Sequence, residues 1–302
     1  MKLIEYLNIN YCFGDDYITL LRMDNMVKEI VKTNSNYLYV NESMDMNLQP
    51  ITPISIISMN PDTDFPKPKK YIKEKYNDSM PFDKEQQDML EQLDYFYKVD
   101  IDVLENIGDN VKRIFLHSVG KLHPKLTMLP IGRDFKNESF FKYADGLSKK
   151  NKPILCYYNV TLPPNVFHWY GMIRTHIYNI VKQKDFIKHK KCDMHPRTYS
   201  QNDIASYYDD LSQSKFVICP RGCGIDTYRL WDSIYMGCIP IIEKYEGYQQ
   251  FEDLPILFIQ HWKEIEGFTR EYLESKWIEM VDKEYNYDKL RLSYWKHRIL
   301  EE

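Results

Sequence analysis

Short continuous apolar runs separated by polar segments form the main pattern of this 302-residue chain. Two such runs lie at 216–219 and 238–242, and a glycine-bearing turn and a short helical stretch lie between them. Apolar runs without alternation are typical of strands covered on both faces, as in a parallel sheet. The segment 215–242 therefore predicts a strand, a turn, a helix and a second strand, with Gly237 ending the helix.

The rest of the chain repeats this alternation of strands and helices. Strands are expected at 2–9, 36–40, 54–59, 111–117, 126–130 and 153–158, and helices at 17–31, 83–97, 166–184, 203–212 and 268–302. Strands that alternate with helices predict an α/β fold with a mostly parallel sheet.

The polar stretch at 134–152 is the expected linker between two domains, because domain boundaries fall in polar segments. It predicts an N-terminal domain at 1–145 and a C-terminal domain at 146–279. The tail at 280–302 is long enough to pack back on the first domain.

The turn between the two apolar runs suits the binding of a diphosphate. Arg221, Gly222 and Gly224 form a segment whose backbone can approach a ligand closely. Asp226 or Thr227 can cap the following helix. The start of that helix directs free N–H groups toward the edge of the sheet where ligands bind.

Two charged residues of the predicted helix, Arg229 and Asp232, are three positions apart and share a face. The guanidinium of Arg229 can bind phosphate oxygens with two parallel hydrogen bonds. The carboxylate of Asp232 can accept hydrogen bonds from a vicinal diol such as a ribose. An ordinary ion pair on a helix surface is the alternative interpretation.

The stretch CPRGCGIDTYRLWDSIYMGCIPII resembles the C-terminal signature of exostosin-like glycosyltransferases. The matching residues are Cys219, Pro220, Arg221, Gly222, Gly224, Asp226, Arg229, Trp231, Gly237 and Pro240. Downstream, DLP at 253–255 and HW at 261–262 are similar to the continuation of this signature. Upstream, LPIG at 129–132 resembles a motif of small soluble bacterial and viral members.

The resemblance implies a GT-B architecture, in which two Rossmann-like domains face a cleft and a C-terminal helix crosses back. It implies inverting transfer of a sugar from a nucleoside-diphosphate sugar to a hydroxyl of an oligosaccharide or other glycoconjugate acceptor. A UDP-sugar is the expected donor, with a weak preference for UDP-xylose. No cofactor is expected, because fixed cations and helix N–H groups can stabilise the leaving phosphate; Arg174 is expected to reach the diphosphate from the other side.

An inverting reaction needs a base that deprotonates the acceptor hydroxyl. In similar folds the base lies in the N-terminal domain, so Asp16 is preferred and Asp15 is the second choice. Asp62 and His117 are lesser candidates.

Two departures from the signature keep alternatives open. Asp232 stands where the family has Glu, and Met59 stands where small relatives carry His. The chain could instead be a nucleotide-sugar-binding protein without turnover, or keep only the fold for an interaction role. A further alternative is a metal-dependent transferase in which Asp62 and Asp64 hold Mg²⁺ or Mn²⁺, though a metal is not expected.

Composition and charge narrow the class of protein and its expected compartment. The net charge of −4 argues against a nucleic-acid-binding protein. Neither a signal peptide nor a run of ~18–20 apolar residues is evident, so a cytoplasmic protein is expected, in the host cytoplasm if viral. His189, Cys192 and His195 form a cluster that lacks an evident fourth ligand for zinc.

Overall fold

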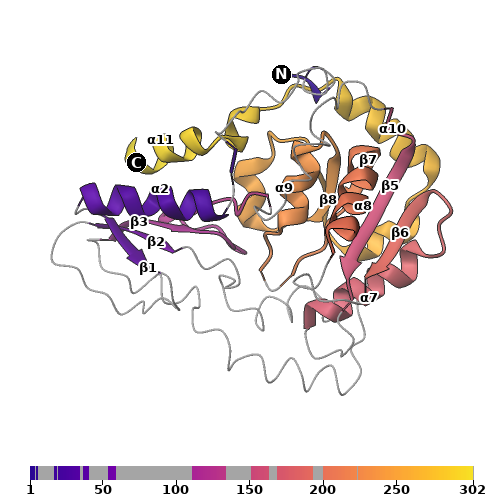
Figure 1. Cartoon of the computed structure of the whole chain (residues 1–302), viewed down its shortest axis with the longest axis horizontal. Helices are drawn as coiled ribbons and strands as arrows, with labels where there is room; N and C mark the ends of the chain where they lie inside the picture. Colours follow the sequence, from indigo (N-terminus) through magenta and orange to yellow (C-terminus); the bar gives the residue numbers. More distant parts are fainter. Residues whose placement is uncertain are drawn as a thin grey trace.

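The computed structural model describes residues 1–3, 5, 17–18, 20–34, 37–40, 54–58, 111–133, 151–162, 169–192, 200–222 and 224–301. In this part of the chain, two separate parallel sheets are flanked by helices (Figure 1). The predicted α/β fold with parallel strands is therefore confirmed.

The N-terminal sheet contains four parallel strands that lie side by side in chain order. They are β1 (Tyr37–Val40), β2 (Ile54–Ser58), β3 (Val111–Leu116) and β4 (Leu126–Met128). Helix α2 (Leu20–Thr33) lies along this sheet (Figure 1) and buries Met23, Val27 and Ile30, which recur on one helical face. The predicted strands at 36–40, 54–59, 111–117 and 126–130 agree with these four within two residues.

The C-terminal sheet contains five parallel strands in the order β6-β5-β7-β8-β9. Their bounds are β5 (Ile154–Thr161), β6 (Ile187–Cys192), β7 (Ser214–Ile218), β8 (Ile239–Glu243) and β9 (Leu257–Ile259). From β5 the chain passes to β6 on one side and then to β7 on the other, so the winding direction reverses between β5 and β7. Such a reversal is the switch point at which open α/β sheets bind ligands.

Helices connect the strands of this sheet. They are α7 (Trp169–Val181), α8 (Gln201–Ser212) and α9 (Tyr228–Tyr235). Helix α10 (Arg270–Val281) follows the last strand, and Figure 1 shows the four helices arranged around the sheet. A capping box fixes the start of α8, because Ser200 and Asp203 each accept a hydrogen bond from the other's backbone N–H. Gly237 has a φ of 64° and ends α9, as its sequence position predicts.

The chain ends near the N-terminal sheet. Beyond β8 lie η4 (Glu246–Phe251), η5 (Trp262–Gly267), α10, η6 (Tyr287–Leu290) and α11 (Leu292–Glu301). Helix α11 packs beside α2 (Figure 1), and Trp295 is buried where it contacts Phe251 at 5.8 Å between ring centroids. This buried aromatic side chain anchors the tail.

One predicted strand is wrong, one observed strand was not predicted, and the last residue of the expected linker is buried. Residues 2–9 do not form a strand where they are described, because Lys2 makes one isolated bridge to Glu284 and Leu3 and Glu5 are helical. β6 is a strand that the lysine-rich sequence did not indicate. Lys152, assigned to the linker, is 6% exposed, and its ammonium donates to the carbonyls of Ser212, Ser214 and Met236.

Lysines on β6 suit its position at the edge of the sheet. Charged side chains on an edge strand oppose pairing with another chain. Lys188 and Lys190 both contact the buried carboxylate of Asp210, at 2.6 and 2.5 Å. An edge strand can therefore carry lysines at alternate positions, which hides the apolar pattern of a strand.

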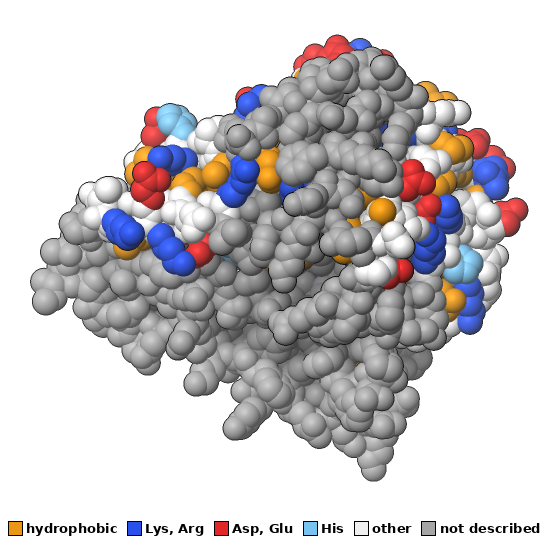
Figure 2. All heavy atoms as spheres, viewed as in Figure 1, with side chains coloured by type: hydrophobic (Ala, Val, Ile, Leu, Met, Phe, Trp, Pro, Cys, Tyr) orange, Lys and Arg blue, Asp and Glu red, His pale blue; other side chains and the backbone are white. Residues whose placement is uncertain are grey.

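On the face shown in Figure 2, Lys and Arg side chains are interspersed with Asp and Glu side chains over the described surface. None of the helices in the described part of the chain has the length and apolar character needed to cross a bilayer. The predicted helix at 83–97 and the residues Asp62 and Asp64 lie outside the described residues.

Candidate functional site

The candidate site lies at the carboxyl ends of β5 and β7, on either side of the switch point. Arg174 of α7 connects the two strand ends, because its guanidinium donates to the carbonyl of Thr161 at 3.2 Å and to that of Arg221 at 2.9 Å. The side chain predicted to reach the diphosphate therefore lies at the predicted edge of the sheet. It also holds the Arg221 backbone in place.

The loop after β7 is compact. The N–H of Gly222 donates to the carbonyl of Gly224 at 3.1 Å. A Cβ on Gly222 would lie 3.2 Å from Nη2 of Arg174, so the guanidinium packs against the bare backbone. Gly222 does not have a positive φ; close approach of Arg174, rather than left-handed backbone, is what favours glycine here.

Arg221 is 2% exposed, and its guanidinium lies 5.9 Å from the ring centroid of Tyr245. This side chain is therefore enclosed by protein. Glu243, at the carboxyl end of β8, is 2% exposed and accepts a hydrogen bond from Tyr245 at 2.8 Å. Sequence reasoning missed Glu243, although its place directly after the apolar run at 238–242 was a usable signal.

Arg229 is the second residue of α9 and is half-buried. Its guanidinium lies 5.8 Å from the ring centroid of Tyr207 on α8. Burial raises the pKa of Tyr207 well above its usual value of 10, and the positive charge of Arg229 opposes this rise. The same charge opposes the rise in the pKa of Tyr157 and of Tyr158 on β5, so Arg229 lies near one of the two strands at the switch point.

Asp232 is only 3% exposed. Its Oδ2 accepts a hydrogen bond from the hydroxyl of Tyr208 at 3.3 Å. α8 therefore supports both charged residues of α9, with the ring of Tyr207 beside Arg229 and the hydroxyl of Tyr208 on Asp232. The sequence signal for this pair was the two adjacent tyrosines in a capped helix that leads into the signature.

Asp226 is enclosed by protein, with an exposed fraction of 4%. Its Oδ1 accepts from the N–H of Thr227 at 2.9 Å and from Nε1 of Trp231 at 2.8 Å, and its Oδ2 accepts from the N–H of Ile131 at 2.9 Å. Burial raises the pKa of Asp226 to about 7, and these hydrogen bonds limit the rise. Thr227 occupies the N-cap position of α9, but its side chain makes no capping hydrogen bond.

Of the four candidates for the catalytic base, the structure describes only His117. Asp15, Asp16 and Asp62 lie outside the described residues. His117 is fully buried at the end of β3, and its Nδ1 donates to the carbonyl of Leu129 at 2.9 Å. Burial lowers the pKa of His117 to about 4. A fully enclosed ring cannot take a proton from an acceptor in this conformation, so His117 is a poor candidate for the base.

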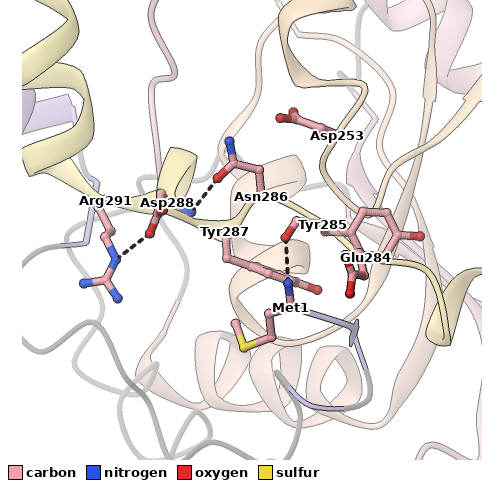
Figure 3. Close-up of a pocket in the computed structure, with 8 residues that line it drawn as sticks. All are labelled: Met1, Asp253, Glu284, Tyr285, Asn286, Tyr287, Asp288 and Arg291. Carbon is pink, nitrogen blue, oxygen red and sulfur yellow. Dashed lines mark hydrogen bonds and ion pairs between the residues drawn. The ribbon is translucent and has the colours of Figure 1, made fainter.

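A separate hollow of about 520 Å³ lies where the start of the chain meets the tail (Figure 3). It is lined by Met1, Asp253, Glu284, Tyr285, Asn286, Tyr287, Asp288 and Arg291. It shares no residue with the candidate site. In the described residues, no cluster of three His, Cys, Asp or Glu side chains could hold a metal ion.

These features define an α/β protein with a glycine-bearing loop, a short helix and two arginines at the switch point of a parallel sheet. A family model, the RXYLT1 C-terminal domain, matches residues 135–297, which is more than half of the chain. The chain therefore belongs to this family of glycosyltransferases. The enzyme class predicted from the signature is confirmed.

Two individual proteins are similar to parts of this chain. Ribitol-5-phosphate xylosyltransferase 1 of Danio rerio is 26% identical over 135 residues, which is 39% of this chain and 29% of that protein. The chain therefore matches less than a third of this relative's length. A crystal structure of an α1,3-fucosyltransferase covers 88% of this chain and 78% of its own, at 13% identity and a TM-score of 0.33. A likeness at this score carries no conclusion about fold or function.

Proposed function

We propose that this protein is an inverting glycosyltransferase that moves a sugar from a UDP-sugar to a hydroxyl of a glycan acceptor without a metal. The observation that carries the proposal is the position of Arg229 and Arg174 at the switch point beside the loop at 219–227. Open α/β sheets bind their ligands at this place. Arginine is well suited to a diphosphate because its planar guanidinium matches phosphate oxygens.

In the proposed reaction, the base takes the proton from the acceptor hydroxyl. The acceptor oxygen then forms a bond to the anomeric carbon, and the bond from that carbon to the diphosphate oxygen breaks. The negative charge that develops on UDP is stabilised by Arg229 and by the N–H groups that begin α9. Asp16, with Asp15 as second choice, remains the proposed base.

We also infer that the two parallel sheets belong to the two Rossmann-like domains of a GT-B architecture. Contacts between the halves support this inference, because they join the carboxyl ends of strands from both sheets. Ile131, beyond β4, bonds to Asp226 beyond β7, and the Met128 carbonyl at the end of β4 accepts a hydrogen bond from Gln250 of η4, beyond β8. Facing carboxyl edges are the geometry that this architecture requires.

UDP-xylose is the proposed donor, and the name of the zebrafish relative supports this choice by specifying xylosyl transfer. The same name makes a ribitol 5-phosphate group the first acceptor to test. The experiment is a panel of UDP-xylose, UDP-glucuronic acid, UDP-galactose and UDP-N-acetylglucosamine, read by thermal shift and by UDP release. A bound donor raises the unfolding temperature because it binds the native state.

We expect UDP-xylose to stabilise the protein most and to release UDP faster when a ribitol-5-phosphate acceptor is added. Stabilisation without UDP release would favour a nucleotide-sugar-binding protein. If none of the four donors stabilises the protein, the proposed function is wrong.

Chelation separates the proposal from the metal-dependent alternative. We expect EDTA-treated protein to keep its transfer activity, because the proposed charge stabilisation comes from arginine and backbone N–H groups. The metal-dependent alternative would be favoured if EDTA abolished the activity and Mn²⁺ restored it, and if Asp62→Ala were inactive even with Mn²⁺.

A further inference from the structure

Helix α9 is bonded to the N-terminal half of the chain near both of its ends. Asp226, two positions before the helix, accepts a hydrogen bond from the N–H of Ile131 at 2.9 Å. Tyr235, the last residue of the helix, accepts a hydrogen bond from the N–H of Ile18 at 2.9 Å. The two partners of these contacts are 95 and 217 residues away in the sequence.

The two contact points in the N-terminal half are themselves joined. The N–H of Arg133 donates to the carbonyl of Ile18 at 3.1 Å. Gly132 has a φ of 71°, and a Cβ on it would lie 2.3 Å from the Ile18 oxygen. Ile18 and the segment 131–133 therefore form one packed unit, and α9 is bonded to both parts of it.

The hydroxyl of Tyr235 forms hydrogen bonds that a phenylalanine at the same position could not form. The side chain is fully buried, and a phenylalanine ring would fill the same space. The hydroxyl accepts from the Ile18 N–H and donates to the Leu290 carbonyl at 2.5 Å. It therefore connects α9, the N-terminal half and the C-terminal tail through a single atom.

Ile18 lies two residues after Asp16, the proposed base, and Arg229 lies six residues before Tyr235. We propose that Tyr235 is a positioning residue for glycosyl transfer: its hydroxyl fixes the segment next to the base relative to the helix that binds the donor diphosphate. This inference rests on the proposed function. A displacement of about 1 Å between reacting groups costs ~100-fold in rate, so such a contact affects turnover without touching substrate.

Tyr235→Phe tests the inference, because it removes only the hydroxyl. We expect kcat to fall ~10-fold to ~100-fold while the KM for UDP-xylose changes less than about twofold. Tyr285→Phe is the matched control, since the buried Tyr285 hydroxyl donates to the Met280 carbonyl at 3.0 Å, outside the candidate site. Equal kcat values in the two variants would overturn the inference.

Amide hydrogen exchange gives a readout that does not depend on turnover. The Ile18 amide should exchange at least ~10-fold faster in Tyr235→Phe than in Tyr285→Phe, because only the former loses its acceptor. If Tyr235→Phe does not fold, the inference can still be tested on the native protein. In that protein, saturating UDP should slow hydrogen exchange at the Ile18 amide. An unchanged Ile18 rate in these comparisons would overturn the inference, whereas a native protein that neither binds UDP nor uses a donor would overturn the proposed function itself.

Discussion

The two parallel sheets of this protein differ in the order of their strands. In the C-terminal sheet the order reverses between β5 and β7, and the signature loop lies at that reversal. In the N-terminal sheet the four described strands follow one another in chain order. A reversal creates a crevice in which neighbouring crossovers leave the sheet on opposite faces, and ligands bind there.

This difference explains why one half of the site is legible from sequence and the other is not. In the C-terminal half, the glycines and Arg229 lie within a short segment, so strand, loop and helix build the site locally. In the N-terminal half, position depends on contacts between distant segments, such as Ile18 with Tyr235 and Ile131 with Asp226. No short motif encodes such contacts.

The largest expected effect comes from the packed unit in the N-terminal half. Gly132→Ala places a Cβ 2.3 Å from the Ile18 oxygen and requires a φ that alanine rarely adopts, so we expect a loss of unfolding free energy on the order of 3 kcal/mol or more. Chemical denaturation measures it. Gly267→Ala is the matched control, because its Cβ would have no neighbour within 4 Å. Similar stabilities for the two variants would contradict the packing described for Ile18.

A smaller effect is expected from Arg174 at the switch point. Arg174→Ala leaves the Thr161 and Arg221 carbonyls without this donor and loosens the loop, so we expect UDP affinity to fall ~10-fold. Isothermal calorimetry measures it. Lys184→Met is the control, because Lys184, beyond the end of α7, also donates to two carbonyls, those of Glu266 and Phe268. A weaker affinity in both variants would indicate general loosening rather than a site at the switch point.

The local elements could be predicted because apolar runs and glycine position determine them. The runs at 216–219 and 238–242 correspond to β7 and β8 within two residues, and the positive φ of Gly237 confirms its role. The charges of Arg229 and Asp232 do fall on one helix, but sequence could not reveal that Tyr208 encloses Asp232. Sequence could place Asp226 at the start of the helix, but it could not reveal that the second carboxylate oxygen accepts the N–H of Ile131, 95 residues away.

Some other segments were predicted less well for a related reason. β6 and residues 2–9 show that edge strands and chain ends lack a clear apolar pattern, so lysines hid one strand and an apolar start suggested another. The burial of His117 also involves a contact with a separate segment, because its ring donates to the carbonyl of Leu129 beyond β4. The base itself, Asp16 or Asp15, stays a prediction.

The two halves should respond to pH with opposite signs. Asp226 has a folded pKa of about 7 against a usual 3.8, so the folded state binds the extra proton and stability falls as pH rises from about 4 to 7. His117 has a folded pKa of about 4 against 6.5, so stability falls as pH drops from 6.5 toward 4. We expect the unfolding free energy of the native protein, relative to Asp226→Asn, to decrease across pH 4–7.

The difference in unfolding free energy between the native protein and His117→Gln should change in the opposite direction over the same pH range. The native protein should become more stable relative to this variant as pH rises. Urea denaturation at several pH values measures both differences. A flat difference for Asp226→Asn would contradict the burial of that carboxyl between the two halves.

The smallest effect is expected between α8 and α9. Tyr208→Phe removes the hydrogen bond to the buried Asp232 carboxylate, so we expect a loss of about 1 kcal/mol in unfolding free energy and a modest rise in donor KM. Tyr207→Phe keeps the ring beside Arg229 and should change both quantities less. The reverse order would show that the Tyr207 hydroxyl, rather than its ring, supports the site.

The central claim is that the helix after the signature loop binds the donor diphosphate, and calorimetric titration of UDP tests it most directly. Arg229→Ala should weaken UDP binding by ~100-fold, because it removes the cation that we propose contacts phosphate, and should leave the unfolding temperature nearly unchanged. Arg270→Ala, which removes an exposed arginine on α10, should bind UDP like the native protein. Equal UDP affinity in the native protein and Arg229→Ala would contradict the account.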